Sequence, residues 1–151
     1  MKLTMNRIRQ GEDEVIIRYR EMNEQIEMLA VLAEGKGQKI SAGYEGETIL
    51  IRPEAILYLE SVDGATWAYL ADKVCRVYVS LEKAVLMWGE RGFFRCSKSM
   101  VINIYRIDTL KSESGNRILA QMENGEQVMI SRRYSRELRA ILKGGAEDEE
   151  E

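Results

Sequence analysis

The first quarter of the chain combines a short strand pattern with a helical one. β-Branched residues in the run 15–19 predict a strand. Between residues 26 and 33 the apolar positions recur at helical spacing, and Asn23 just before them suits a helix N-cap. The glycine-rich segment 35–39 then predicts a linker. We therefore expect residues 1–42 to form an N-terminal strand–helix extension with its linker.

From residue 43 onward the pattern is that of a mainly β domain. Short apolar runs alternate with turn signals roughly every 8–12 residues. Strands are expected at 48–51, 56–62, 67–70, 74–79, 93–96, 102–104, 106–110, 117–122 and 127–130. A helical turn at Pro53 and a helix that Ser80 caps and Gly89 ends interrupt them. Many short strands of this kind favour a β-sandwich or a small β-roll with short helices.

The C-terminal part of this domain is expected to close with a hairpin and a helix. Asn124-Gly125 is typical of a type I′ turn, in which both central residues have a positive φ. Residues 134–142 predict a helix that Gly144-Gly145 ends. The acidic segment after it is expected to be disordered. The predicted domain therefore spans 43–143, and the predicted tail spans 144–151.

The composition excludes several classes of function. The chain has no histidine and only two cysteines, which lack CxxC spacing. A Cys/His zinc site and catalysis by an imidazole base are therefore excluded. Because glycine-rich phosphate-binding motifs are also missing, we expect no enzyme activity, no cofactor and no metal. No apolar run approaches the roughly 18–20 residues of a membrane span and no signal sequence is visible, which indicates a soluble, cytoplasmic protein.

Two interpretations remain open for the cysteines. Cys75 and Cys96 can be reduced thiols that pack as small apolar groups. Alternatively, Cys96 senses redox state, since it lies two residues before Lys98.

Charge is unevenly distributed along the chain, whose net charge is −3. Residues 1–42 carry seven positive and seven negative side chains, and residues 43–90 sum to −4. Residues 91–143 carry eleven positive against five negative side chains, a sum of +6. The local excess of positive charge, more than the net charge of the whole chain, determines whether a face attracts phosphates. Residues 91–143 are therefore the candidate nucleic-acid-binding region.

Three segments of the β domain follow one another in an order that is typical of one family. The first is Ile56-Leu57-Tyr58-Leu59-Glu60-Ser61, a strand that ends near an acidic residue. The second is Phe93-Phe94-Arg95-Cys96-Ser97-Lys98-Ser99-Met100-Val101-Ile102-Asn103, followed by Ile107. The third is Asn124-Gly125, followed by Ile130-Ser131-Arg132-Arg133-Tyr134. Over roughly residues 45–143 this order and spacing resemble the LytTR DNA-binding domain of bacterial response regulators.

The resemblance implies a mainly β domain, an elongated fold of small antiparallel β-sheets with short helices. Such a domain would insert loops, rather than a recognition helix, into successive major grooves of duplex DNA. Lys98 matches the family's basic position in the central loop, and Arg133 matches the second arginine of the closing motif. Thr66, or alternatively Trp67, would lie in the loop after the first strand pair. Lysine lacks arginine's bidentate fork, so we expect Lys98 to approach DNA more than to read guanine. The DNA-contacting residues expected from the resemblance are Thr66, Trp67, Ser97, Lys98, Ser99, Ser131, Arg132 and Arg133.

The same residues can be interpreted without the family. Residues 131–133 place a hydroxyl and two guanidinium groups at the end of a hairpin, which suits contacts with phosphates and guanine. If the strand continued there, the two arginines would face opposite sides, and Arg133 is our choice for the groove. The alternative is that both arginines pair with Glu137 or Glu126 on the surface. Residues 97–99 form a polar tip between apolar anchors, which suits a rigid binding loop but also an ordinary solvated turn.

Four other polar or aromatic residues are expected to be structural. Asn103 follows three apolar residues, and its amide can pin a turn. Tyr134 is expected to pack at the start of the last helix. Trp67 and Trp88 are interpreted as core or partner-facing residues more than as base-stacking ones.

The predicted function is a sequence-specific transcriptional regulator. The resemblance implies promoter direct repeats as the target, bound by a homodimer or by two adjacent copies. Because only residues 1–42 precede the β domain, we expect a stand-alone regulator without a receiver domain. Those residues would pack on the β domain or mediate dimerisation. The alternative function is a protein-interaction or adaptor module without DNA binding.

Overall fold

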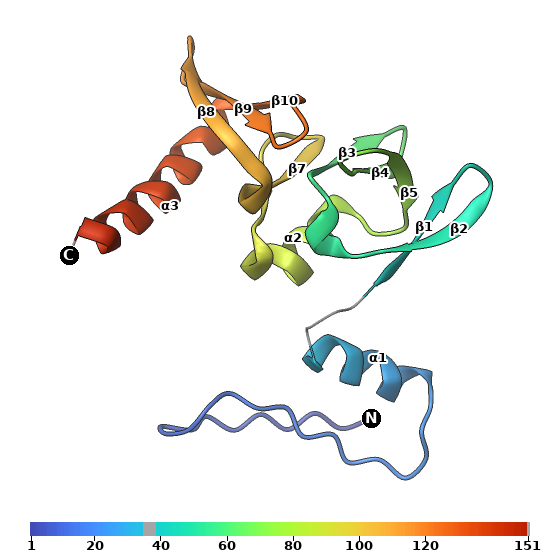
Figure 1. Cartoon of the computed structure of the whole chain (residues 1–151). Coiled ribbons are helices and arrows are strands. Elements are labelled where there is room, and N and C mark those ends of the chain that lie inside the picture. The colour runs from blue at the N-terminus through green and yellow to red at the C-terminus, as the bar shows by residue number, and fades with distance from the viewer. Residues whose placement is uncertain (35–38, 151) are drawn as a thin grey trace. The chain divides into compact units, whose positions relative to one another are not determined.

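The N-terminal unit contains one capped helix. The computed structural model describes residues 1–34 and 39–150, in two units, Met1–Gln38 and Lys39–Glu151 (Figure 1). Helix α1 spans Glu24–Glu34, and the Asn23 side chain accepts a hydrogen bond from the Ile26 N–H at 3.1 Å. The predicted helix and its N-cap are confirmed. The predicted linker at 35–39 lies outside the described residues except for Lys39.

The strand predicted at residues 15–19 is wrong for the single chain. Residues 12–19 run without a helix, turn or bend, but they pair with no other described segment. A strand requires a hydrogen-bonded neighbour, and an apolar β-branched run cannot supply one by itself.

The second unit is built on a seven-stranded antiparallel sheet. Its strands follow the order β2-β1-β5-β4-β3-β7-β6. Their bounds are β1 Ile40–Tyr44, β2 Glu47–Ile51, β3 Tyr58–Val62, β4 Ala65–Tyr69, β5 Val74–Val77, β6 Phe93–Arg95 and β7 Met100–Asn103. The first strand begins at Ile40, three residues before the predicted start of the domain.

A smaller sheet and two helices complete this unit. The three-stranded sheet has the order β10-β9-β8, with β8 Ile107–Glu113, β9 Arg117–Met122 and β10 Gln127–Ile130. Helix α2 spans Leu81–Trp88 and α3 spans Arg132–Glu150. Short 3-10 turns occur at Pro53–Ala55, Gly89–Arg91 and Ile104–Arg106. The predicted mainly β fold with short helices is confirmed.

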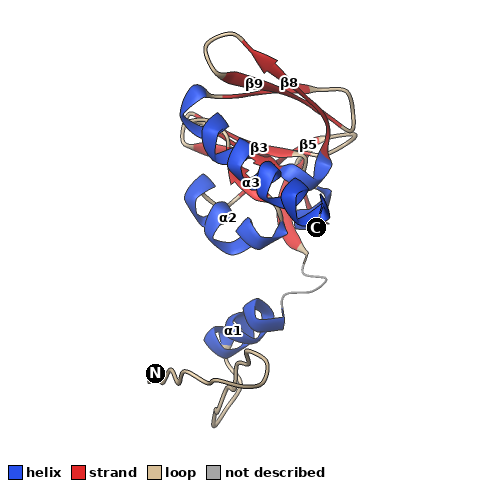
Figure 2. Cartoon of the chain, turned by 90° about the vertical axis from the view of Figure 1, so that its left-hand side faces the viewer, coloured by secondary structure: helices blue, strands red, loops and turns tan. Residues whose placement is uncertain are grey.

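Two apolar cores lie on the two faces of the larger sheet. Helix α2 contacts β3, β6 and β7, and buried Trp88 packs against Phe93 with ring centroids 5.2 Å apart. The second core joins Ile102 of β7 to the smaller sheet and to Leu138 of α3. Figure 2 shows α2 and α3 as separate helices beside the strands. The prediction that Trp88 is a core residue is confirmed.

Glycine-containing turns set the register of the hairpins. Asp63 and Gly64 have φ values of 52° and 78°, and Val62 pairs with Ala65, as in a two-residue type I′ hairpin. The type I′ turn predicted for Asn124-Gly125 is wrong, because only Gly125 has a positive φ, of 91°. There the Asn124 side chain instead accepts the Glu126 N–H at 3.1 Å, so a longer turn is stabilised locally.

Helix α3 differs from its prediction at both ends. It begins at Arg132, so Arg132 and Arg133 lie in its first turn rather than on a continuing strand. It continues past Gly144-Gly145 to Glu150, where a helix end and a disordered tail were expected. Alanine and glutamate after the glycines are strong helix formers, which offsets part of the cost of glycine.

Candidate nucleic-acid interface

The loop of residues 97–99 is held from inside by Arg95. The Arg95 Nε donates to the Ser97 carbonyl at 2.7 Å, and its Nη2 donates to the Lys98 carbonyl. The Ser99 carbonyl accepts the Ser61 N–H of β3 at 2.8 Å. These bonds attach the loop to the sheet at both ends, while Lys98 and Ser99 stay exposed. The loop therefore holds the charged side chain of Lys98 at the surface, on a backbone that these hydrogen bonds fix in place.

The closing motif is attached to the same loop. The Ser131 N–H donates to the Cys96 carbonyl at 2.8 Å. The Ser131 carbonyl accepts the Tyr134 and Ser135 N–H groups at 3.0 and 2.9 Å, which begins α3. The sequence places Ser131 two residues before Arg133, and Cys96 two residues before Lys98. The structure therefore brings the two predicted basic segments together.

The basic side chains that are predicted to contact DNA form no ion pair among the described residues. The ion pairs among the described residues are Arg91–Glu54, Arg106–Glu123 and Lys111–Glu113. Lys98, Arg132 and Arg133 are exposed. The Glu126 carboxylate, which was the alternative partner for the arginines, instead accepts hydrogen bonds from Tyr58 and Asn124.

Aromatic packing orients the start of α3. The Arg133 guanidinium lies 5.4 Å from the centroid of the Tyr134 ring. That ring makes an edge-on contact with Phe94 at 6.4 Å. The prediction that Tyr134 packs at the start of the last helix is confirmed. The guanidinium of Arg133 therefore lies beside a ring whose position is set by packing, and the Arg133 side chain remains exposed.

Thr66 and Trp67 lie on strand β4 and not in a loop. Thr66 pairs with Ser61 and with Val77, and is only 7% exposed. Trp67 pairs with Glu60 and Arg76 and is half-buried. The predicted loop position is wrong because the preceding turn uses only Asp63-Gly64, so the strand begins at Ala65.

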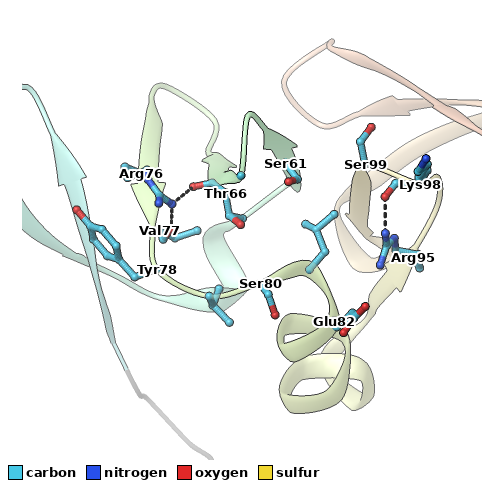
Figure 3. A pocket seen from close by; sticks show the side chains of 13 residues that line it. Ser61, Thr66, Arg76, Val77, Tyr78, Ser80, Glu82, Arg95, Lys98 and Ser99 are labelled. Atoms are coloured by element: carbon cyan, nitrogen blue, oxygen red, sulfur yellow. Dashed lines mark hydrogen bonds between the residues drawn. The ribbon is translucent and has the colours of Figure 1, made fainter.

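Thr66 and Lys98 nevertheless line one open groove of about 780 Å³. Figure 3 shows Thr66 and Arg76 on one side of it, Lys98 and Ser99 on the other, and Ser80 between them. Arg76 Nη1 donates to the Thr66 carbonyl at 3.1 Å. Sequence reasoning missed Arg76, because it lies within the segment 43–90, whose summed charge is negative.

Asn103 has the structural role expected of it. It is 2% exposed, its Nδ2 donates to the Ile56 carbonyl at 2.9 Å, and its Oδ1 accepts the Tyr105 N–H at 3.1 Å. Both ends of the amide are used, which fixes the end of β7.

Burial makes the Cys96 thiol a weak acid. The side chain is fully buried, and desolvation raises the pKa of the thiol to about 12. The thiolate is the reactive form of cysteine, so this environment favours the inert interpretation of Cys96 over the redox one. Burial and the hydrogen bond to Glu126 also raise the pKa of Tyr58.

The described part of the chain contains no helix that is long and apolar enough to cross a bilayer.

Comparison with known proteins identifies this architecture. The family model described as the LytTr DNA-binding domain matches residues 46–143. The sensory transduction protein LytT of Bacillus anthracis is 27% identical over 126 residues, which cover 82% of this chain and 49% of that protein. The chain thus spans about half the length of this curated relative.

A solved structure shows the same fold. It is the LytTr DNA-binding domain of a Bacillus cereus protein described as a methyl-accepting/DNA response regulator. The match has a TM-score of 0.65 and 23% identity, and covers 69% of this chain and 95% of the other. With the family match over residues 46–143, this chain belongs to the LytTR DNA-binding domain family.

Proposed function

We propose that this protein is a sequence-specific transcriptional regulator that presents residues 97–99 and 131–133 to the same stretch of duplex DNA. The observation that carries this proposal is the hydrogen bond between the Ser131 N–H and the Cys96 carbonyl. It joins the backbones of two exposed basic segments that are 35 positions apart when counted from Lys98 to Arg133. A surface of this kind can contact phosphates from several elements at once.

The start of α3 supports an anionic partner. Arg132 and Arg133 occupy its first turn, which contains no acidic residue. Cations are unfavourable there, because the N-terminal end of the helix dipole is itself positive. A DNA phosphate beside Arg132 would offset this unfavourable charge, and a helix N-terminus is suited to an anion because its first N–H groups have no partner within the helix.

Each predicted residue has a role in this proposal. Lys98 and Arg132 neutralise phosphates, while Arg133, with its bidentate fork, reads a base in the major groove. Ser97, Ser99 and Ser131 supply short-range donors close to the backbone. Thr66 lies in the base of the groove with Arg76 beside it, so DNA would reach it only by entering the groove. Trp67 is the next residue on β4, so its side chain is on the opposite face of the strand; it lines a separate hollow and would contact a phosphate only from that side.

The proposed target is a pair of direct repeats in a promoter. One domain offers one set of loops, which covers a short site, and two domains on successive repeats lengthen the recognised sequence. Two adjacent copies or a homodimer would satisfy this requirement.

A band-shift titration tests the proposal. We expect the full chain to retard promoter DNA of its own operon at moderate salt and to bind a random duplex of equal length at least about a thousand-fold more weakly. Binding should weaken steeply with salt, because counterions are released from phosphates. Absence of retardation, together with capture of a protein partner, would favour the adaptor function. Equal affinity for both duplexes would exclude sequence specificity.

A further inference from the structure

Residues 12–20 have a sequence that is complementary to itself when reversed. The segment reads Glu-Asp-Glu-Val-Ile-Ile-Arg-Tyr-Arg, with Ile16 at its centre. Glu12 and Glu14 on one side of this centre mirror Arg20 and Arg18 on the other, while Asp13 mirrors the neutral Tyr19. Reversing the direction of the segment therefore places a positive charge where each glutamate was.

Among the residues that the structure describes, this segment has no strand partner. It runs without helix, turn or bend from Glu12 to Tyr19, as the extended trace in Figure 1 shows. Val15 is 68% and Ile16 71% exposed. None of its charged side chains takes part in the ion pairs found among the described residues. Its apolar groups, charges and backbone are all available at once.

We propose that residues 12–20 form an antiparallel strand pair with the same residues of a second copy, with the two-fold axis at Ile16. Position i then faces position 32 − i, so Glu14 faces Arg18 and Glu12 faces Arg20. Both pairs occur twice because the axis is two-fold. They share one face of the ribbon with Ile16, because side chains alternate along a strand.

The opposite face of the ribbon is apolar at its centre. There Val15 faces Ile17 of the partner subunit, again twice, and Asp13 faces the Tyr19 hydroxyl. Opposite charges and β-branched pairs directly across two strands stabilise a sheet, whereas like charges destabilise it. A shift of register by one residue would place Ile16 opposite Val15 or Ile17 and replace the four ion pairs by two, between Asp13 and either Arg18 or Arg20.

The second copy fits better than an unrelated partner for a further reason. In a unit of this size the buried apolar surface is small, and short segments rarely fold without association or staples. Ile26 is the large apolar side chain that is buried in the described part of this unit, while Leu32, Met22 and Tyr19 remain more than half exposed. Pairing residues 12–20 of two copies would bury exposed apolar side chains of both chains in a single interface. This dimer concerns residues 12–20, so it does not depend on the proposed DNA binding.

Charge reversal provides a sharp test, carried out on the full chain without DNA. The wild type should sediment at twice the chain mass of 17.4 kDa and dissociate on dilution. The double variants Glu12→Arg with Glu14→Arg, and Arg18→Glu with Arg20→Glu, should each be monomeric, since each places like charges opposite one another. An equimolar mixture of the two should form a heterodimer, because all four pairs are restored in trans.

Cross-linking tests the register. Residues directly opposite in an antiparallel pair have Cα atoms roughly 4.5–5.5 Å apart, which a disulfide can bridge. Ile16→Cys should therefore give a covalent dimer under mild oxidation, while Glu12→Cys, as the control, should not. A wild type that remains monomeric, double variants that still dimerise, or a mixture that remains monomeric would overturn the proposal. Cross-linking that is equal at positions 12 and 16 would overturn this register.

Discussion

The N–H of Ser131 donates a hydrogen bond to the carbonyl oxygen of Cys96 at 2.8 Å. This bond connects the residue just before α3 with the residue just before the loop of residues 97–99. Arg95 holds the other side of that loop through the Ser97 and Lys98 carbonyls. The positions of Lys98 and Arg133 therefore depend on one shared backbone frame, and changes to that frame should affect both.

Arg133→Ala should weaken binding to the specific duplex by about 1–3 kcal/mol and relax the choice of base at one position. The reason is the loss of a bidentate contact with a base edge. Fluorescence anisotropy with single-base substitutions in the site measures both effects. Arg132→Ala is the control, because we expect it to lose affinity equally for every sequence. If Arg133→Ala also loses specific and random binding equally, Arg133 contacts only phosphate.

Lys98→Ala should lower affinity for all duplexes and reduce the slope of log K against log salt by about one. One fewer phosphate would be neutralised, so one fewer counterion would be released. A salt titration of binding measures the slope. Lys2→Ala removes the same charge from the N-terminal unit and should leave the slope unchanged. An unaltered slope in Lys98→Ala would remove Lys98 from the phosphate-binding residues.

Arg95→Lys should weaken specific DNA binding about tenfold, or about 1.4 kcal/mol. Lysine keeps the charge but lacks the fork that donates to two carbonyls of the loop. Amide hydrogen exchange at residues 97–99 should become faster at the same time. Arg91→Lys, which alters the ion pair with Glu54, is the matched control. If amide exchange at residues 97–99 and DNA affinity are both unchanged in Arg95→Lys, the hydrogen bonds from Arg95 are not what holds the loop.

Asn103→Leu should lower the free energy of unfolding by roughly 2 kcal/mol or more. The substitution leaves the Ile56 carbonyl and the Tyr105 N–H without the partner that Asn103 provides. Urea unfolding measures the loss. Asn124→Ala removes a side chain that bonds a backbone N–H at an exposed turn, so its effect should be smaller. Comparable losses in the two variants would contradict a special role for the buried amide.

Stability should fall at alkaline pH partly through Cys96. Burial raises the pKa of this thiol from 9.0 to about 12, so folding favours the protonated form. Its contribution is complete below about pH 9 and is lost as the pH rises toward 12. Between about pH 8 and 10.5 the wild type should lose roughly 1–2 kcal/mol more stability than Cys96→Ala. Equal losses in denaturant titrations of the two proteins would show that the thiol is not protected.

Much of the fold could be predicted from local sequence. The Asn23 and Ser80 caps marked two helix starts, because a short polar side chain can accept an N–H of the first turn, as Ser80 does from Lys83 at 3.1 Å. Asn103 was recognisable as structural from the apolar residues before it. The type of the turn at Asn124-Gly125 was not predictable from the pair alone, because the Asn124 side chain stabilises a different turn.

The errors concern features that depend on other parts of the molecule. Residues 15–19 have strand character, but a strand forms only with a partner, which residues 1–34 and 39–150 of the single chain do not provide. The resemblance places Thr66 in a loop, whereas the short turn at Asp63-Gly64 leaves it on β4. The participation of Arg76 in the groove depends on the pairing of β5 with β4 and on its hydrogen bond to the Thr66 carbonyl, which local sequence does not encode.

Photo-cross-linking from positions 98 and 133 tests the central claim most directly. A photoreactive amino acid replaces Lys98 in one protein and Arg133 in another, and the cross-linked bases are mapped on the same specific duplex. We predict that both positions cross-link within one turn of the DNA, about 10 base pairs, because their backbones share one frame. Cross-links farther apart than one turn, or from only one of the two positions, would contradict a common DNA-facing surface.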